Sequence, residues 1–305
     1  MSLPNRVEFC EVGPRDGFQF EDKKIPTSLK VDLVSGLADA GLKRIQVASF
    51  VHPEWVPQMA DAEEVVARLP DRADVTYSGL ALNLTGVKRA REAGLSHIDL
   101  SIATNDAHSR ENANMTVDEA IAQAETMVAY ANKHDLQAQL GFQTVFGYRA
   151  PGDTPLARVL VMAERFAEMG ISSLSLADTT GMANPLMIEE RVQAVQAMID
   201  DVPLVLHLHD TRGLGLTNVY AALGCGVTWF DTSFAGMGGC PFVHGAAGNI
   251  ATEDTAYMMQ QLGIEVGVDF RKVAACSKRI EAFLEKPFPG KIHRLLQREE
   301  KQANV

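Results

Sequence analysis

The chain has 305 residues, of which 46% are hydrophobic and 22% charged, an ordinary globular composition with enough apolar material for a full core. Its formal net charge of -11 argues against a nucleic-acid-binding surface, because such a surface needs clustered Lys and Arg. Four widely spaced cysteines argue against a disulfide scaffold, and no apolar run is long enough for a signal peptide or a membrane span. We therefore expect a cytoplasmic protein that binds neither nucleic acid nor membrane.

Short apolar runs alternate with longer amphipathic stretches along the whole chain. The sequence predicts strands at 7–12, 44–49, 75–81, 97–102, 137–142, 172–177, 203–208 and 228–233. It predicts helices near 28–41, 58–69, 84–94, 116–134, 155–169, 185–200, 213–225 and 250–262. This alternation is typical of parallel strands joined by crossover helices. Eight such units predict a closed barrel rather than an open sheet.

Glycines follow several of the predicted helices, where a C-terminal cap requires a positive φ: Gly41, Gly94, Gly170 and Gly263. We therefore predict an α/β fold in which residues 1–305 form one catalytic domain. A single (β/α)8 TIM barrel should cover about 5–265, and extra C-terminal helices should follow over about 266–297.

The segment LVLHLHDT at 204–211 is the most informative one for function. His207 and His209 are two residues apart, so on a strand their side chains point to the same face. At the C-terminal end of a barrel strand, that face is the mouth of the barrel, where active sites of this fold lie. Two imidazoles there indicate a metal site. In isolation, the same pattern is more typical of a hydrogen-bonded pair of core histidines.

Three other segments favour the metal site. GPRDG at 13–17 follows the first strand, so Asp16 can supply an oxygen ligand and Arg15 a fixed cation, although a solvated surface ion pair would have the same sequence. LADTTG adds the carboxylate of Asp178 to the same rim. The glycine-rich segment 236–249 carries Cys240, a candidate reactive thiol or an inert small side chain, and ends in Asn249.

The two histidines, the aspartate and the asparagine make a mixed nitrogen and oxygen set. Together with water, such a set suits a six-coordinate divalent ion, and favours Mg or Mn over tetrahedral zinc. Imidazole favours Mn over Mg. Ligation by Cys240 would instead indicate zinc, which is the main competing metal.

These segments resemble the HMG-CoA lyase family of metal-dependent barrel enzymes. The matching stretches are EVGPRDGFQFE (11–21), ASFVHPEWVPQMAD (48–61), LADTTG (176–181), HLHDTRG (207–213) and FAGMGGCPFVHGAAGNIATED (234–254). The resemblance spans roughly residues 5–285. The GGCP segment is specific to the lyase branch, whereas HxHD and RDG also occur in isopropylmalate and homocitrate synthases.

The resemblance implies a carbon–carbon lyase that cleaves a 3-hydroxy-acyl-CoA in a retro-Claisen reaction, and a homodimer. It implies metal ligation by Asp16, His207, His209 and Asn249. Catalytic roles fall to Arg15, which would hold the enolate oxygen, to Asp16 or His207 as the base, and to Cys240, which would relay a proton. Substrate contacts are predicted for Gln19, Gln46, Ser175, Asp178 and Glu253.

The chain departs from the family pattern on segments that face the substrate. Gln46 stands where the family usually has a glutamate, and QTVFGYRAPG (143–152) lacks a usual cysteine. HMG-CoA itself would yield acetyl-CoA and acetoacetate, but citramalyl-CoA or a thioester with a longer branch also fits. The sequence is also compatible with a Claisen-type synthase, an aldolase for a free 2-oxo acid, or a non-catalytic metal-binding or scaffold protein.

Overall fold

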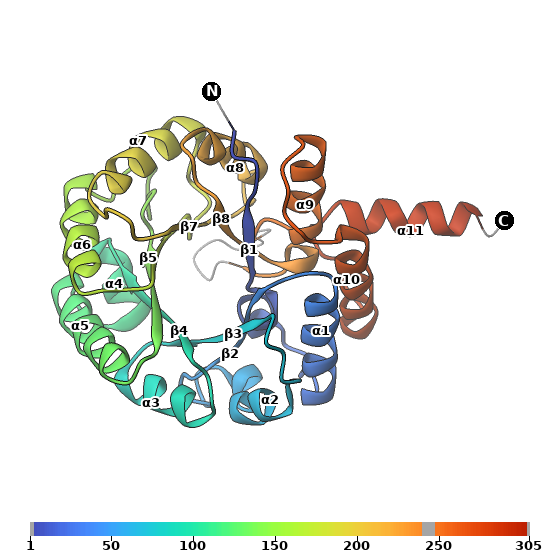
Figure 1. Cartoon of the computed structure of the whole chain (residues 1–305), viewed down its shortest axis with the longest axis horizontal. Helices are drawn as coiled ribbons and strands as arrows, with labels where there is room; N and C mark the ends of the chain where they lie inside the picture. Colours follow the sequence, from blue (N-terminus) through green and yellow to red (C-terminus); the bar gives the residue numbers. More distant parts are fainter. Residues whose placement is uncertain (1–2, 240–247, 304–305) are drawn as a thin grey trace.

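The computed structural model of the chain describes residues 3–239 and 248–303, with side chains described as far as residue 299. All eight predicted strands form, and neighbouring strands pair in parallel around a closed barrel. The predicted TIM barrel is therefore confirmed (Figure 1). The strands are β1 (Glu8–Glu11), β2 (Arg44–Ser49), β3 (Thr76–Ala81), β4 (His97–Ala103), β5 (Gln137–Gln143), β6 (Ser173–Ala177), β7 (Leu204–His207) and β8 (Trp229–Thr232).

The barrel closes where the first strand meets the last. β1 pairs with β8 in parallel, so that Glu8 lies opposite Trp229 and Glu11 lies opposite Thr232. The strands are short and mostly buried, as expected for parallel strands covered on both faces. Closure brings the end of β1, with its GPRDG segment, beside the ends of β7 and β8.

A ring of helices covers the outside of the barrel (Figure 1). Glycines end several of them with a positive φ, including Gly41 at 103° and Gly94 at 100°. Thr116 and Glu119 form a reciprocal capping box at the start of α5. The ring consists of α1 (Thr27–Asp39), α2 (Ala62–Arg68), α3 (Leu84–Glu92), α5 (Val117–Lys133), α6 (Leu156–Glu168), α7 (Pro185–Gln196), α8 (Gly215–Gly224) and α9 (Thr252–Gln261).

A short helix that the sequence pattern did not predict, α4 (Asp106–Ala113), follows β4 at the mouth of the barrel. Its sequence, DAHSRENA, has no apolar stripe, so hydrophobic periodicity contains no signal for it. The signal lies in its caps. Asn105 accepts hydrogen bonds from Ala107 N and His108 N, and Asn114 ends the helix in the left-handed conformation.

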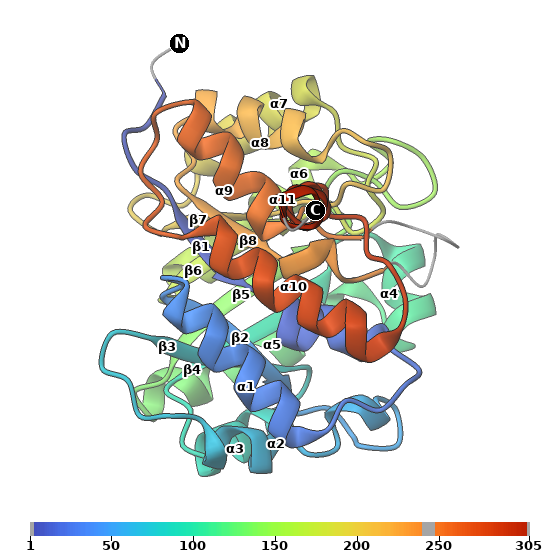
Figure 2. The ribbon, with the colours of Figure 1, turned by 90° about the vertical axis from the view of Figure 1, so that its right-hand side faces the viewer.

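Two helices follow the barrel, α10 (Phe270–Leu284) and α11 (Ile292–Ala303). Figure 2 shows α10 lying beside α1 and α9, against which it packs. Helix α11 continues past the predicted end at 297 and extends away from the barrel (Figure 1). In the described part of the chain, no helix is both long and apolar enough to cross a membrane.

Candidate active site

The C-terminal ends of the barrel strands surround a cavity of about 240 Å³. Active sites of this fold lie at that end of the barrel. Polar side chains that line the cavity include Arg15, Asp16, Gln19, Gln46, Asp99, His108, Asn112, Gln139, Gln143, Ser175, His207, His209 and Asp231. The cavity is therefore strongly polar and combines groups from seven of the eight strands or from the segments that follow them.

His207 ends β7, and His209 follows it by two residues, so both imidazoles line the cavity. Their Nε2 atoms lie 3.2 Å apart. The Nδ1 atom of His207 lies 3.2 Å from the Oδ2 atom of Asp231 on β8. A carboxylate in this position holds the proton of His207 on Nδ1 and leaves the lone pair of Nε2 facing the other ring.

The two histidines differ in their protonation. Burial and the positive charge of His207 lower the pKa of His209 to about 3, so His209 is a neutral imidazole at neutral pH. Burial also disfavours the charged form of His207, but the hydrogen bond and charge of Asp231 outweigh it and raise the pKa of His207. Neutral imidazole is the form that binds a metal ion.

The GPRDG segment forms a single π-helical turn, Gly13–Gly17, directly after β1. The guanidinium of Arg15 donates to Asp16 Oδ1 at 2.7 Å, and Gln19 Nε2 donates to the same oxygen at 2.9 Å. Burial raises the pKa of Asp16, but the charges of Arg15 and His207 outweigh it and lower the pKa below its ordinary value. Asp16 is therefore an anion at neutral pH, available as an oxygen ligand.

Asn249 is held beside the histidines by backbone hydrogen bonds. The segment 248–251 pairs with the chain that leaves β7, through Ile250 N to Leu208 O at 3.1 Å and Asp210 N to Gly248 O at 2.8 Å. This pairing forms a bridge between Asn249 and His209. The Nδ2 atom of Asn249 donates to Asp16 Oδ2 at 2.6 Å. Its Oδ1 atom is buried and accepts no hydrogen bond from the described residues.

These four residues fit a divalent metal ion. One ligand atom each from Asp16, His207 and His209 lie within 4.8 Å of one another. When His207 is neutral, two imidazole lone pairs, the carboxylate of Asp16 and the amide oxygen of Asn249 are all electron-rich ligand atoms, and a cation among them would stabilise the arrangement. Such a mixed nitrogen and oxygen set suits Mg or Mn better than a thiolate-rich zinc site.

Gln46 on β2 joins the arginine to a buried acid. Its Oε1 atom accepts a hydrogen bond from Arg15 Nε, and its Nε2 atom donates to Asp99 Oδ2 at 2.5 Å. Ser78 Oγ donates to the same carboxylate oxygen at 2.6 Å. Burial raises the pKa of Asp99 in spite of these bonds and of the nearby charge of Arg44. An amide at position 46 thus separates Arg15 from a second acidic group.

The other predicted contacts divide into two groups. Gln19, Gln46 and Ser175 line the cavity, and Ser175 Oγ lies 3.4 Å from Asp231 Oδ2. Asp178 does not line the described cavity. Its Oδ1 atom accepts hydrogen bonds from the backbone N–H groups that follow at Met182 and Ala183, and burial raises its pKa to about 6.

Glu253 was also predicted to contact the substrate, and that role stays a prediction. Glu253 is fully buried at the start of α9 and does not line the described cavity. Its carboxylate accepts hydrogen bonds from Ala235 N, at 3.1 and 3.2 Å, and from Ser277 Oγ at 2.8 Å. In this structure its carboxylate therefore binds the turn that contains Ala235 and helix α10.

Cys240 lies outside the described residues, so its predicted role as the reactive thiol stays a prediction. Gly239, the last described residue before it, lines the cavity, and a Cβ atom added there would lie 3.4 Å from the ring of Phe20.

Several residues of the site were missed by sequence reasoning. Asp99, Gln139 and Asp231 lie within predicted strands, where a polar side chain interrupts an apolar run. That interruption is the signal for an inward-facing polar group, because successive strand residues alternate between the two faces. His108 and Asn112 were missed because they belong to the unpredicted helix α4.

A family model described as HMGL-like matches residues 6–280. The chain belongs to this family. It is 38% identical over 291 residues to the hydroxymethylglutaryl-CoA lyase of Bacillus subtilis, which covers 95% of this chain and 97% of the relative. It is also 38% identical, over 94% of this chain and 95% of the relative, to the 3-hydroxy-3-isohexenylglutaryl-CoA/hydroxymethylglutaryl-CoA lyase of Pseudomonas aeruginosa.

Solved structures of the family superpose on nearly the whole chain. The lyase of Pseudomonas aeruginosa gives a TM-score of 0.94 at 37% identity, covering 98% of this chain and 100% of that one. An HMG-CoA lyase from Acinetobacter baumannii, solved with coenzyme A and 3-methylmalate, gives 0.90 at 35% identity and covers 96% of each chain. The predicted family and the predicted carbon–carbon lyase class are therefore confirmed.

Proposed function

We propose that this lyase cleaves HMG-CoA or a close 3-hydroxy-acyl-CoA analogue at the barrel mouth, in a retro-Claisen reaction that depends on Mg or Mn. The relatives named as hydroxymethylglutaryl-CoA lyases and the coenzyme A complex of one family member support the substrate class. The observation that carries the metal dependence is the convergence of Asp16, His207 and His209, with ligand atoms within 4.8 Å of one another. The buried, unpartnered Oδ1 atom of Asn249 supplies a fourth donor.

A divalent ion held by these residues would polarise the substrate's tertiary hydroxyl and lower its pKa. The proton of that hydroxyl passes to a base on the rim, either Asp16 or His207. The C2–C3 bond then breaks, and its electron pair moves into the thioester carbonyl. The products of this step are a ketone and the enolate of acetyl-CoA; for HMG-CoA, the ketone is acetoacetate.

Arg15 is the group that would hold the enolate oxygen. Its guanidinium is already fixed by Asp16 at 2.7 Å and by the amide of Gln46, so it needs little reorganisation when negative charge develops. Cys240 would donate the proton that converts the enolate carbon into the methyl group of acetyl-CoA. Its position after the cavity-lining Gly239 supports this role.

The acyl specificity rests on the side chains around Gln46. The cavity, of about 240 Å³, has room for a short branched acyl group, so the nucleotide end of coenzyme A would lie outside it. One relative is named for two thioesters, one of them with an isohexenyl branch. We therefore keep citramalyl-CoA and longer-branched thioesters as candidates beside HMG-CoA.

The test is a panel of 3-hydroxy-acyl-CoA thioesters, incubated with purified protein and Mg or Mn, with acetyl-CoA release as the readout. The proposal predicts release from HMG-CoA or from at least one close analogue. Condensation of acetyl-CoA with a 2-oxo acid, without cleavage of any thioester, would instead support a Claisen-type synthase. No release from any member of the panel would contradict the proposal.

We also propose a homodimer and a cytoplasmic location, both of which stay predictions from the sequence. Light scattering on the purified full-length chain tests the first, with a mass near twice 33.1 kDa expected. Cell fractionation tests the second.

A further inference from the structure

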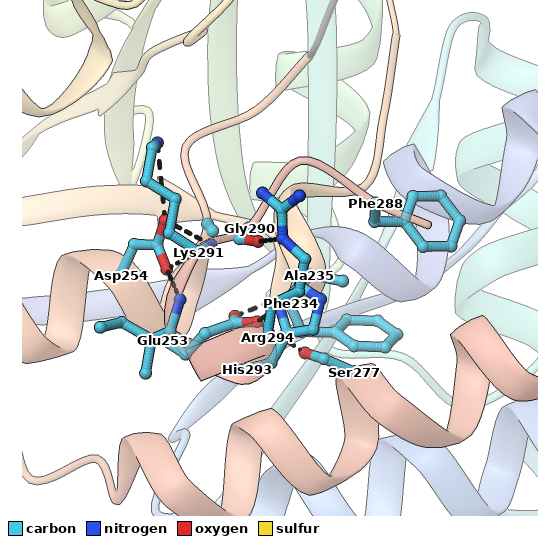
Figure 3. Close-up of polar contacts among 12 residues, drawn as sticks. Phe234, Ala235, Glu253, Asp254, Ser277, Phe288, Gly290, Lys291, His293 and Arg294 are labelled. Carbon is cyan, nitrogen blue, oxygen red and sulfur yellow. Dashed lines mark hydrogen bonds and ion pairs between the residues drawn. The ribbon is translucent and has the colours of Figure 1, made fainter. Parts of the chain in front are cut away.

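A cluster of buried polar groups lies behind the site, where the C-terminal segment 288–294 meets α9 and α10 (Figure 3). His293, in the first turn of α11, is fully buried. Its Nδ1 atom lies 2.9 Å from Glu253 Oε1 and its Nε2 atom lies 3.0 Å from Glu281 Oε1. The proposed reaction uses none of these three residues, although burying the carboxylate of Glu253 and the imidazole of His293 is costly.

The cluster and the segment beside it bind both backbone polar groups of Ala235, in the turn at 234–237. Glu253 accepts hydrogen bonds from Ala235 N, and Gly290 N donates to Ala235 O at 2.8 Å. Ala235 has a φ of 61°, a left-handed conformation that costs a non-glycine residue free energy and persists only when its surroundings hold it. The C-terminal segment therefore helps to stabilise the left-handed conformation of Ala235.

The segment approaches Ala235 as closely as a backbone can. A Cβ atom at Gly290 would lie 2.9 Å from both Ala235 O and His293 Nδ1, so only glycine fits there. Asp254 fixes the start of α11, because its carboxylate accepts hydrogen bonds from Lys291 N and Ile292 N at 2.8–3.0 Å. The position of His293 is thus set by its own helix as well as by Glu253.

Ala235 is connected to the metal ligands through the next residues of its turn. Met237 N donates to Phe234 O at 3.2 Å, which closes the turn. Met237 O then accepts a hydrogen bond from Asn249 Nδ2 at 3.0 Å, and the same nitrogen donates to Asp16 Oδ2 at 2.6 Å. With both hydrogens of its amide committed, Asn249 has a fixed orientation, and its Oδ1 atom is the one left for a metal ion.

We propose that His293 is a positioning residue for the metal site. It holds Glu253 against Ala235, and the turn at 234–237 then holds the amide of Asn249 in the orientation that ligates the ion. The inference rests on the proposed function, since Asn249 must be a metal ligand. The C-terminal segment would then help to orient a metal ligand as well as to stabilise the fold. This role explains why a buried histidine lies between two carboxylates outside the barrel.

Two isosteric variants separate this role from simple packing. The amide nitrogen of asparagine lies close to the position of Nδ1, so His293→Asn keeps the donor to Glu253 and loses the donor to Glu281. The amide nitrogen of glutamine lies close to the position of Nε2, so His293→Gln does the reverse. Both variants are uncharged. Leu295→Ala, on an exposed face of the same helix, is the control.

The experiment titrates Mn²⁺ alone into each full-length variant and follows free Mn²⁺ by electron paramagnetic resonance. For His293→Gln we expect a Kd for Mn²⁺ about 10-fold higher than that of the wild type, at the low end of the range for direct partners of a ligand, because His293 acts on Asn249 through Glu253 and the turn at 234–237. A similar fall in kcat should follow, with little change in KM. His293→Asn should stay close to the wild type, and Leu295→Ala should match it.

The inference is contradicted if His293→Asn and His293→Gln bind Mn²⁺ equally well, whether both resemble the wild type or both are equally weakened. If His293→Gln does not fold, Ser277→Ala removes another donor to Glu253 without altering α11, and the same rise in Kd, of smaller size, is expected. A wild type that binds Mn²⁺ but cleaves no thioester overturns the reaction alone. A wild type that binds no Mn²⁺ overturns this inference as well.

Discussion

Gln46 donates a hydrogen bond to the buried carboxylate of Asp99, with 2.5 Å between Nε2 and Oδ2. The same side chain accepts a hydrogen bond from Arg15, so an uncharged amide connects the cation of the site to a second acid. The resemblance of the sequence to the family implies a glutamate at this position. In this chain, a glutamate at position 46 would place its carboxylate against that of Asp99, which already contacts the side chain at this position.

Gln46→Glu is therefore expected to destabilise the protein, by about 1–3 kcal/mol at pH 8, since a buried hydrogen bond is replaced by repulsion. The pKa of Asp99 is already raised by burial, so one carboxyl group of the new pair should retain its proton at lower pH. The loss should accordingly shrink at pH 5.5. Chemical denaturation at pH 8 and pH 5.5 measures this loss of stability, and Gln143→Glu, at another residue that lines the cavity, is the control. Equal stability of Gln46→Glu and the wild type at both pH values would contradict the prediction.

Asp231 orients His207 from the neighbouring strand, with 3.2 Å between Oδ2 and Nδ1. Asp231→Asn should raise the Kd for Mn²⁺ about 10–100-fold, because the second partner of a ligating histidine fixes its tautomer and ring orientation. Isothermal titration calorimetry measures the change. Ser175→Ala, which loses only a 3.4 Å contact to Asp231, should have a much smaller effect. Unchanged affinity in Asp231→Asn would remove His207 from the ligand set.

Glu11, at the end of β1, binds both the turn at 234–237 and the start of α9. Its carboxyl group accepts hydrogen bonds from Gly13 N at 2.8 Å, Phe234 N at 3.0 Å and Thr252 Oγ1 at 2.6 Å. Burial nevertheless raises its pKa to about 8. The folded protein thus keeps a proton that the unfolded chain loses near pH 4.5, and the stability from this group is lost as the pH rises from about 4.5 to about 8.

Glu11→Gln lacks this titration, so it provides the reference. The free energy of unfolding of the wild type, minus that of Glu11→Gln, should fall as the pH rises through this window. Urea denaturation at several pH values gives the difference. A difference that stays constant between pH 5 and pH 8 would show that Glu11 does not take up a proton on folding.

Cys240→Ala should lower turnover roughly 10²–10⁴-fold, the usual contribution of one acid–base group. Its affinity for Mn²⁺ should stay near that of the wild type, because the thiol is not in the proposed ligand set. Stopped-flow measurement of acetyl-CoA release tests the first expectation. Wild-type turnover in this variant would remove Cys240 from the mechanism, and loss of metal binding would favour a zinc site with Cys240 as a ligand.

The barrel could be predicted because each of its units carries a local signal. The runs at 44–49 and 137–142 are short and apolar, and glycines such as Gly41 mark helix ends. Helix α4 could not be predicted in this way, since its eight residues are polar and its stability depends on its caps and on the barrel beneath it.

The candidate site was predictable where a motif and a strand end coincide, as for Asp16 and His209. Glu253 shows the limit, because proximity in the sequence to Asn249 does not determine which face of α9 its side chain occupies. The role of His293 lay beyond prediction, since its partners Glu253 and Glu281 come from two other helices. Only the packing of α11 against α9 and α10 brings them together.

Removal and return of the divalent ion show whether thioester cleavage depends on a metal ion held at the barrel mouth. The purified protein is stripped with a chelator, and acetyl-CoA release from its best thioester is followed before and after Mn²⁺ or Mg²⁺ is returned. We expect the stripped wild type to be inactive and to regain activity with the ion, whereas His209→Ala, treated in parallel, should stay inactive. Full activity of the stripped wild type, or wild-type activity of His209→Ala, would contradict this expectation.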